Sequence, residues 1–376
     1  MISFEPTEEQ KLLRETIASF AAEQMRPVAR EADEEGRVPE SLVSKAWELG
    51  LVTSGIPASY GGFGDARSAL TGAIALEELG YGDLSIALHV LAPRLLVYPV
   101  VDYGTDSQKT RLLPAFAQGT FRAGTAAVVE PSMCFDLSAL ATTAASTEDG
   151  FVLSGRKAFV PLADASDKLL VYARRADRAR AKSPLEGYGS VDAFLVEPGL
   201  PGLTIGSPEK NMGIKALRSH EISLDGVRVG RCARLGGEGG IDFARLMNRS
   251  RVALAALAIG VARAAFDYAR EYAKERKAFG VAIAQKQAIA FMLAEMAIEI
   301  DATRLLVWEA AWKLDRGEEA TREAYLAKNY AATTALKVTD NAVQVLGGHG
   351  YIRDHPVELW LRNARGFASF EGLATV

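Results

Sequence analysis

The sequence predicts an α+β protein in which a helical region, a β region and a second helical region follow one another. Before about residue 118 and beyond 236, apolar residues recur at the three- and four-residue spacing of amphipathic helices. Between them the apolar residues form short runs separated by Gly, Pro, Asp and Asn, which is typical of strands and turns. We therefore predict three domains, at 1–120, 121–235 and 236–376.

The first domain is predicted to be helical throughout. A Gly-rich break, PASYGGFGDA, interrupts it, and GTDSQKTRLLPAF begins with capping residues that indicate one further short helix. The helical spacing of apolar residues is found at 10–34, 40–49, 68–79 and 84–98.

The middle domain is predicted to be an antiparallel sheet, because its apolar runs follow closely without intervening helices. The runs are TAAVV, FVLSG, KLLVYAR, VDAFLVEP, LTIG and HEISLDGVRV. The basic cluster RRADRARAK at 174–182 is predicted to be a solvated loop, and binding of an anionic substrate tail is the alternative.

The last domain is predicted to be an antiparallel helical bundle. Helical periodicity extends over 251–275, 287–315 and 322–346, so each helix would be about 37 Å long at 1.5 Å per residue. Short connections such as DRGEEAT favour antiparallel neighbours. Ala-rich faces would allow close helix packing or a subunit interface.

Bulk properties exclude several classes of protein. A net charge of −4 provides no basic surface for nucleic acid. The acidic N-terminus MISFEPTEEQ is unlike a signal peptide, and the longest apolar run, VALAALAIGVA, is too short to span a membrane and predicts a buried helix. Two cysteines and four histidines show no metal-ligand spacing. We expect a cytoplasmic protein without a metal site.

One acidic residue raises a functional question. Glu371 lies between Phe370, Gly372 and Leu373 near the end of the chain. A carboxylate enclosed by apolar groups is desolvated and becomes a stronger base. From the residues alone, Glu371 is either such a base or a tolerated carboxylate on a frayed tail.

Seven sequence segments, taken together and in this order, indicate a family resemblance. The chain resembles the acyl-CoA dehydrogenase family over nearly its whole length, in PASYGGFG, YGTDSQKTRLLPAFAQG, FLVEPGLPGLTIG, MGIKALRSHEISLDGVRV, YAKERKAFGVAIAQKQAIAFMLAEMA, AVQVLGGHGY and RNARGFASFEG. The resemblance implies an N-terminal helical domain, a central antiparallel β domain and a C-terminal four-helix bundle. FAD would lie between the last two, and an electron-transferring flavoprotein would accept the electrons. A homotetramer or dimer of dimers is implied.

The resemblance also implies a reaction and its residues. A glutamate would remove an α-proton from an acyl-CoA while the β-hydrogen leaves as hydride to flavin N5, and Glu371 matches that base. Ser250 stands where some relatives carry their glutamate and is not an acid. Acyl-CoA contacts are implied for Asn248, Arg251 and Gly372. The chain's own flavin contacts would be Ala126, Val128, Val129, Phe135, Phe159, Val160 and Pro161. Residues reaching a neighbouring subunit's FAD would be Arg276, Phe279, Gln287, Gln344, Gly347 and Gly348.

The part of the resemblance that would contact the flavin ring departs from the family pattern. Val129 and Pro161 replace threonines, and Pro161 also lacks the backbone N–H that relatives direct at flavin N5. Phe135 replaces a serine, Phe159 a tryptophan, and Leu373 the threonine after the glutamate. The chain ends at Val376, before the terminal helix of relatives.

Three functional hypotheses follow. The first is an acyl-thioester α,β-dehydrogenase with a modified flavin pocket. The second is a flavin-poor subunit of a heteromer that completes a partner's FAD site. The third is a flavoenzyme of altered reaction, acting on a carrier-bound or non-CoA substrate. The acyl chain length would depend on the helices near 84–100, where ALHVLAPRLLVYP is apolar.

Overall fold

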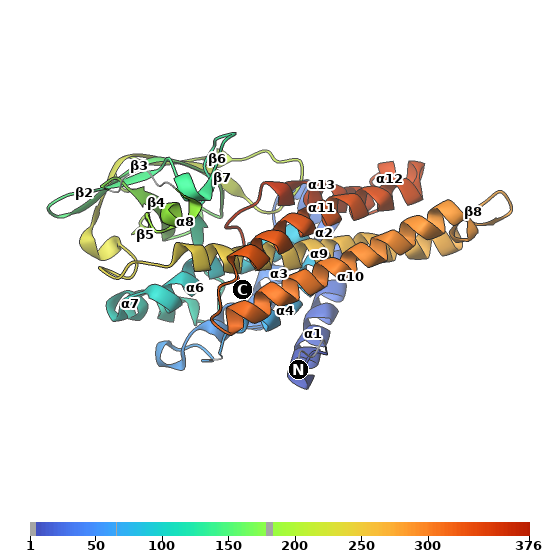
Figure 1. Cartoon of the computed structure of the whole chain (residues 1–376), viewed down its shortest axis with the longest axis horizontal. Helices are drawn as coiled ribbons and strands as arrows, with labels where there is room; N and C mark the ends of the chain where they lie inside the picture. Colours follow the sequence, from blue (N-terminus) through green and yellow to red (C-terminus); the bar gives the residue numbers. More distant parts are fainter. Residues whose placement is uncertain (1–4, 65, 178–182) are drawn as a thin grey trace.

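The computed structural model describes residues 5–64, 66–177 and 183–376. Helices come first in the chain, a seven-stranded sheet follows, and long helices complete it. Figure 1 shows the sheet at one end of the molecule and the long helices extending away from it, with the strand β8 at the opposite tip. The α+β fold class is confirmed.

The N-terminal region contains seven α-helices among its described residues, 5–64 and 66–120. The first begins at a capping box in which Thr7 and Gln10 bond each other's backbone N–H groups. The helices are α1 Glu8–Phe20, α2 Ala29–Glu35, α3 Glu40–Glu48, α4 Ala69–Gly82, α5 Leu84–Leu91, α6 Arg94–Tyr103 and α7 Asp106–Phe116.

Two of the predicted helices are interrupted. The helix expected over 10–34 contains a π turn at Ala21–Met25 and a 3₁₀ turn at Arg26–Val28, which includes Pro27. The helix expected over 84–98 is α5 followed by α6, at an angle of 41°. Pro93 directly precedes α6 and cannot donate the hydrogen bond that would continue α5.

The middle region forms a sheet whose main path is β1–β4–β2–β3–β7–β6, with β5 paired to the other side of β4. The strands are β1 Thr125–Ala127, β2 Thr143–Ser146, β3 Gly150–Pro161, β4 Leu169–Arg175, β5 Val191–Val196, β6 Leu203–Pro208 and β7 Ser219–Gly230. A five-residue helix, α8 Pro184–Tyr188, precedes β5.

The prediction of an all-antiparallel sheet was wrong. β4 is parallel to both β1 and β2, whereas the other pairs are antiparallel. The chain returns from β1 to the parallel β4 through the β2–β3 hairpin, so a hairpin provides the crossover that parallel strands need. Close spacing of strands therefore did not imply antiparallel order. Strand β2 was not predicted.

The C-terminal region is built from α9 Phe243–Glu275, α10 Gln287–Asp315, α11 Thr321–Leu346, α12 Gly348–Tyr351 and α13 Val357–Ala364. A small hairpin, β8 Lys277–Ala278 and β9 Val281–Ala282, joins α9 to α10. Helix α9 begins at Phe243, eight residues before the predicted start, because Asp242 caps it by accepting the Arg245 N–H. The most apolar stretch of α9 is long enough to cross a membrane but is 78% buried inside the protein, as in a core helix.

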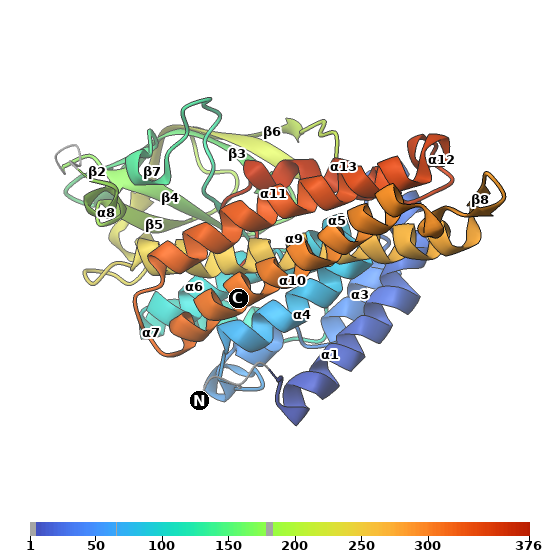
Figure 2. The same cartoon turned by 45° about the vertical axis from the view of Figure 1, so that its right-hand side comes forward.

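The hydrophobic core continues from the helices into the sheet. The largest apolar cluster joins α1, α4, α9 and α11. A second cluster packs α6 and α7 against β1, β4 and the start of α9, and a third lies within the sheet. In Figure 2, α9, α10 and α11 cross the molecule with α1, α3 and α4 on one side. The sheet is thereby fixed against α6, α7 and the start of α9.

Candidate functional site

A cleft of about 910 Å³ lies between the sheet and the C-terminal helices. Segment 129–137 and the 158–159 part of β3 form its sheet side. The helical side consists of α9, α11 and the segment before the C-terminus, with Arg251, Tyr325, Lys328, Asn329, Ala368, Ser369 and Glu371. The cleft brings together residues that are more than 200 positions apart in the sequence.

Glu371 lines this cleft with only 14% of its side chain exposed. Lys328 Nζ lies 3.2 Å from Glu371 Oε1, and Arg251 Nε lies 3.7 Å from Oε2. Both Arg251 Nε and Glu371 Oε2 are buried without a hydrogen-bond partner among the described residues. One carboxylate oxygen is thus held by a lysine, while the other has no hydrogen bond.

The expectation that Glu371 has an apolar setting was wrong. Its neighbours Phe370 and Leu373 are buried in the helical core, whereas the Glu371 side chain faces two cations. Gly372 has φ +67°, a left-handed conformation that turns the backbone between Glu371 and Leu373. Adjacent residues in this irregular segment therefore point to different surroundings.

The predicted substrate residues divide between two environments. Arg251 lines the cleft, donates to Tyr188 Oη at 3.1 Å and lies over the ring of Tyr325 at 5.4 Å. Asn248 is buried beside it and donates to Thr321 Oγ1 at 2.8 Å, so it connects α9 to α11. The third residue of the set, Gly372, lines a separate small pocket.

On the sheet side, Phe159 occupies a β-bulge. The register of β3 against β7 shifts between Lys157 and Val160, and Phe159 has φ +52°, which is rare for a non-glycine residue. Its N–H donates to Glu209 Oε1 at 3.3 Å. The bulge places Phe159 in the wall of the cleft, and such strained positions are frequent at functional sites.

The remaining predicted flavin contacts are only partly brought together. Val129, Phe135 and Phe159 line the cleft, and the N–H of Ala158 donates to the carbonyl of Val129. Two others, Ala126 and Val128, line the small pocket, whereas Val160 and Pro161 are buried in β3 and line neither cavity.

A buried ion pair supports the sheet side of the cleft. Lys157 Nζ donates to Glu130 Oε1 and to the carbonyl of Val128, both at 2.9 Å. Burial lowers the pKa of Lys157 to about 8, partly offset by Glu130. Burial would raise the pKa of Glu130, but Lys157 and the Thr142 N–H hold it below its ordinary value. The pair connects the segment that follows β1 to β3 at the wall of the cleft.

Sequence reasoning missed Glu130, Glu209 and Lys328, which line the cleft, Lys157, which pairs with Glu130, and Tyr172, which lines the small pocket. Single charged or aromatic residues carry no spacing signal, and only the fold shows which of them lie together. Part of the basic cluster predicted at 174–182, namely 178–182, lies outside the described residues; Arg174 and Arg175 belong to β4, and Arg175 pairs with Asp192.

The residues expected to reach a neighbouring subunit gather at the far tip of the helices and do not line the cleft. Arg276 and Phe279 belong to the β8–β9 hairpin, and Gln287 begins α10. Gln344, Gly347 and Gly348 lie at the end of α11. Figure 1 shows this tip at the opposite end from the sheet. Phe279 is 93% exposed, and a Cβ at Gly347 or Gly348 would meet no atom within 4 Å.

The chain's residues fit FAD in two separate places. The cleft is large enough for a planar ring system and offers the aromatic face of Phe159 and the apolar Val129. The exposed tip offers a guanidinium, an aromatic ring and backbone open to close approach, which suit a dinucleotide. Since the two places are far apart, the tip suits a cofactor held mainly by another chain.

The chain belongs to the acyl-CoA dehydrogenase family, because three family descriptions match it almost from end to end. The N-terminal domain of acyl-CoA dehydrogenase matches residues 7–120, the middle domain 125–227 and the C-terminal domain 237–376. The chain is therefore an acyl-CoA dehydrogenase-like flavoenzyme of the oxidoreductase class.

Individual relatives agree with this assignment. The chain is similar to the mitochondrial short-chain specific acyl-CoA dehydrogenase of Bos taurus, with 35% identity over 100% of this chain and 89% of that protein. It is similar to the structure of butyryl-CoA dehydrogenase from Megasphaera elsdenii, with 32% identity and a TM-score of 0.86 over 100% of this chain and 96% of that one. It also resembles an FAD complex of PigA, with 25% identity and a TM-score of 0.88 over 98% and 95%.

Proposed function

We propose that this chain catalyses FAD-dependent α,β-dehydrogenation of an acyl-CoA or other acyl thioester, with Glu371 as the base. The main observation behind this proposal is the position of Glu371 in a wide cleft, where its buried Oε2 accepts no hydrogen bond from the described residues. FAD, when bound, supplies the acceptor for the β-hydrogen and its electron pair. Glu371 takes the α-proton, so the substrate gains a Cα–Cβ double bond.

The cations beside Glu371 have a defined part in this proposal. Arg251 and Lys328 pair with the Glu371 carboxylate and hold it in the cleft as the proton acceptor. Their positive charge also favours the negative charge that develops on the thioester as the α-proton leaves. A substrate that fills the cleft removes water and strengthens both effects.

The test begins with flavin content, measured as absorbance near 450 nm per protein chain. Glu371→Gln is expected to keep the flavin and to lose flavin reduction by acyl-CoA by at least a hundredfold. Glu221→Gln is the matched control, because Glu221 lines the same cleft but pairs with Arg156. Undiminished turnover by the Glu371 variant would remove this residue from the mechanism.

A second candidate function is that of a subunit which completes a partner's FAD site. The exposed tip favours it, because Phe279, Gly347 and Gly348 are absent from the linings of both the cleft and the small pocket. Loss of the hydroxyl groups at Val129 and Pro161 would weaken the chain's own flavin binding. Purification without flavin, not restored by added FAD, would favour this candidate over the first.

We also propose an oligomer, either a homotetramer or dimer or a heteromer with a related chain. Helix α10 carries exposed apolar side chains seven residues apart, at Phe291, Ile298, Leu305 and Trp312. Such a stripe is typical of a helix that packs against another chain. Light scattering tests this interface. We expect Ile298→Asp to give a smaller molar mass in solution than the unmodified protein.

An electron-transferring flavoprotein is the proposed electron acceptor.

A further inference from the structure

The final segment, residues 372–376, is held by side chains of α9 and not by a backbone ladder. Among the described residues, the backbone of this segment makes no hydrogen bond to another backbone group. The Gly372 N–H instead donates to Ser250 Oγ at 3.1 Å, and the Val376 carbonyl accepts from Arg249 Nη1 at 3.1 Å. Two neighbouring residues of α9 therefore fix the path of the segment.

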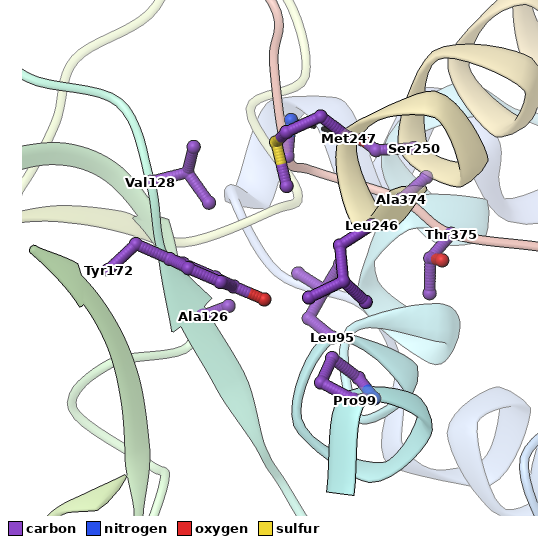
Figure 3. Close-up of a pocket in the computed structure, with 11 residues that line it drawn as sticks. Leu95, Pro99, Ala126, Val128, Tyr172, Leu246, Met247, Ser250, Ala374 and Thr375 are labelled. Atoms are coloured by element: carbon purple, nitrogen blue, oxygen red, sulfur yellow. Dashed lines mark hydrogen bonds between the residues drawn. The ribbon is translucent and has the colours of Figure 1, made fainter. Parts of the chain in front are cut away.

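Apolar packing holds the same segment in place but gives its backbone no direction. Leu373, Ala374 and Val376 are buried in the helical core. Figure 3 shows Ala374 in the wall of the small pocket that Ser250 also lines. Burial of apolar surface is non-directional, whereas a hydrogen bond has a preferred angle. The bond from Gly372 to Ser250 is therefore the contact that orients the backbone here.

This bond acts on the peptide group that directly follows Glu371. The peptide bond between residues 371 and 372 is planar, so the Gly372 N–H and the Cα of Glu371 belong to one rigid unit. Fixing the direction of this N–H fixes the rotation of the unit, and with it the backbone from which the Glu371 side chain extends. The left-handed turn at Gly372, with φ +67°, follows immediately.

Helix α9 supports both the backbone and the carboxylate of Glu371. Ser250 is only 2% exposed and holds the backbone, while its neighbour Arg251 lies with Nε 3.7 Å from Glu371 Oε2. The helix extends over 33 residues, and its turns around Ser250 are buried. Groups placed on a buried helix are held more precisely than groups on a loop. A hydrogen-bond acceptor at position 250 is thus part of the support of the base.

We infer that Ser250 is a positioning residue, which directs the Glu371 carboxylate into the cleft by accepting the Gly372 N–H. The inference rests on the proposed function, because it assigns a support to the base of that reaction. A misplacement of a catalytic group by about 1 Å lowers a rate by about a hundredfold. Loss of this acceptor should therefore appear in the rate and not in the affinity for substrate.

The test compares Ser250→Ala with Ser250→Thr. Alanine removes the acceptor, whereas threonine keeps the hydroxyl and adds a methyl, for which the small pocket of about 20 Å³ has room. The probe is butyryl-CoA or octanoyl-CoA, whichever reduces the flavin of the unmodified protein faster. At saturating thioester, we expect flavin reduction to be about 10- to 100-fold slower in Ser250→Ala and within about threefold of the unmodified rate in Ser250→Thr.

Two further quantities separate positioning from a general structural role. The thioester concentration that gives the half-maximal rate should stay within about twofold in Ser250→Ala, because the substrate's own contacts are unchanged. Flavin content per chain should also stay unchanged, since Ser250 does not line the cleft.

A readout that needs no turnover is hydrogen–deuterium exchange of the Gly372 amide. It should be at least about tenfold faster in Ser250→Ala, where the amide has lost its acceptor, and unchanged in Ser250→Thr. Ser85→Ala is the matched control, because Ser85 is also 2% exposed but lines neither the cleft nor the small pocket. This control should change neither the rate nor the exchange.

Several results would overturn the inference. An unchanged rate or an unchanged exchange in Ser250→Ala would mean that the bond does not orient Glu371. Equal losses in Ser250→Ala and Ser250→Thr, or a fall in flavin content that matches the fall in rate, would show that Ser250 only fills space. If the exchange responds as expected but the unmodified protein is reduced by no acyl-CoA, the proposed dehydrogenation fails, whereas the anchoring of the turn by Ser250 stands.

Discussion

Replacement of Glu209 by alanine is expected to weaken flavin binding, because Glu209 lines the cleft and holds the bulge that carries Phe159. Its Oε1 accepts the Phe159 N–H at 3.3 Å and its Oε2 accepts the Ser219 hydroxyl at 2.7 Å. These bonds hold Phe159 at φ +52°, a conformation that costs about 1–3 kcal/mol. Without Glu209 the bulge can relax and withdraw the ring from the cleft.

The magnitude follows from the bonds that are lost. A hydrogen bond to a charged acceptor contributes about 1.5–3 kcal/mol, and the long Phe159 bond belongs at the lower end of that range. If FAD binding loses about 1.5 kcal/mol because Phe159 is no longer held in place, the Kd for FAD rises about tenfold. The assay is titration of flavin-free protein with FAD, followed by flavin fluorescence.

Two matched variants make the reasoning refutable. Glu209→Gln keeps an acceptor oxygen for the Phe159 N–H, so its Kd should stay within about threefold of the unmodified protein. Glu221→Ala removes a carboxylate that lines the same cleft but pairs with Arg156, so flavin affinity should not change. An unchanged Kd in Glu209→Ala, or equal losses in all three variants, would refute the role of this contact.

The remaining predictions concern stability and the turn at the site. Lys328→Met leaves the Glu371 carboxylate without its nearer cation, so we expect the free energy of unfolding in urea to fall by about 1–3 kcal/mol. An unchanged free energy of unfolding would mean that the ion pair contributes nothing to stability. Gly372→Ala must place a Cβ 2.6 Å from Val128 Cγ2 in a backbone with φ +67°. We therefore expect the free energy of unfolding to fall by at least about 1–2 kcal/mol and flavin-dependent activity to be lower. Full activity would show that the turn adapts. Burial raises the pKa of Asp83 from 3.8 to about 6, so its contribution to stability is present below pH 4 and lost as pH rises through 6. Asp83→Asn should flatten this fall, about 3 kcal/mol at most, in unfolding measured from pH 4 to 7; an unchanged slope would assign it to another group.

The sequence by itself determined the elements whose signal is local. Periodicity predicted a helix over 287–315, and α10 spans Gln287–Asp315. A helical spacing of apolar residues sustained over 29 residues fits a helix and no strand. The family resemblance likewise nominated Glu371 and the tip residues as candidates, since they lie in contiguous segments that the sequence shows directly. The break at Pro93 was also visible in the sequence, although the prediction ran one helix through it.

Only the tertiary structure decided what surrounds those elements. The parallel pairing of β4 with β1 and β2 depends on how the β2–β3 hairpin folds back, which no single strand encodes. Lys328, 43 residues before Glu371, becomes its ion-pair partner because α11 lies beside the final segment. In the sequence Tyr172 looks like any other strand residue. Only the packing of β4 against α6 and α9 places it in the wall of the small, mainly apolar pocket. Local spacing sets helices and strands, but the charge and shape of a site arise from side chains that meet across distant parts of the chain.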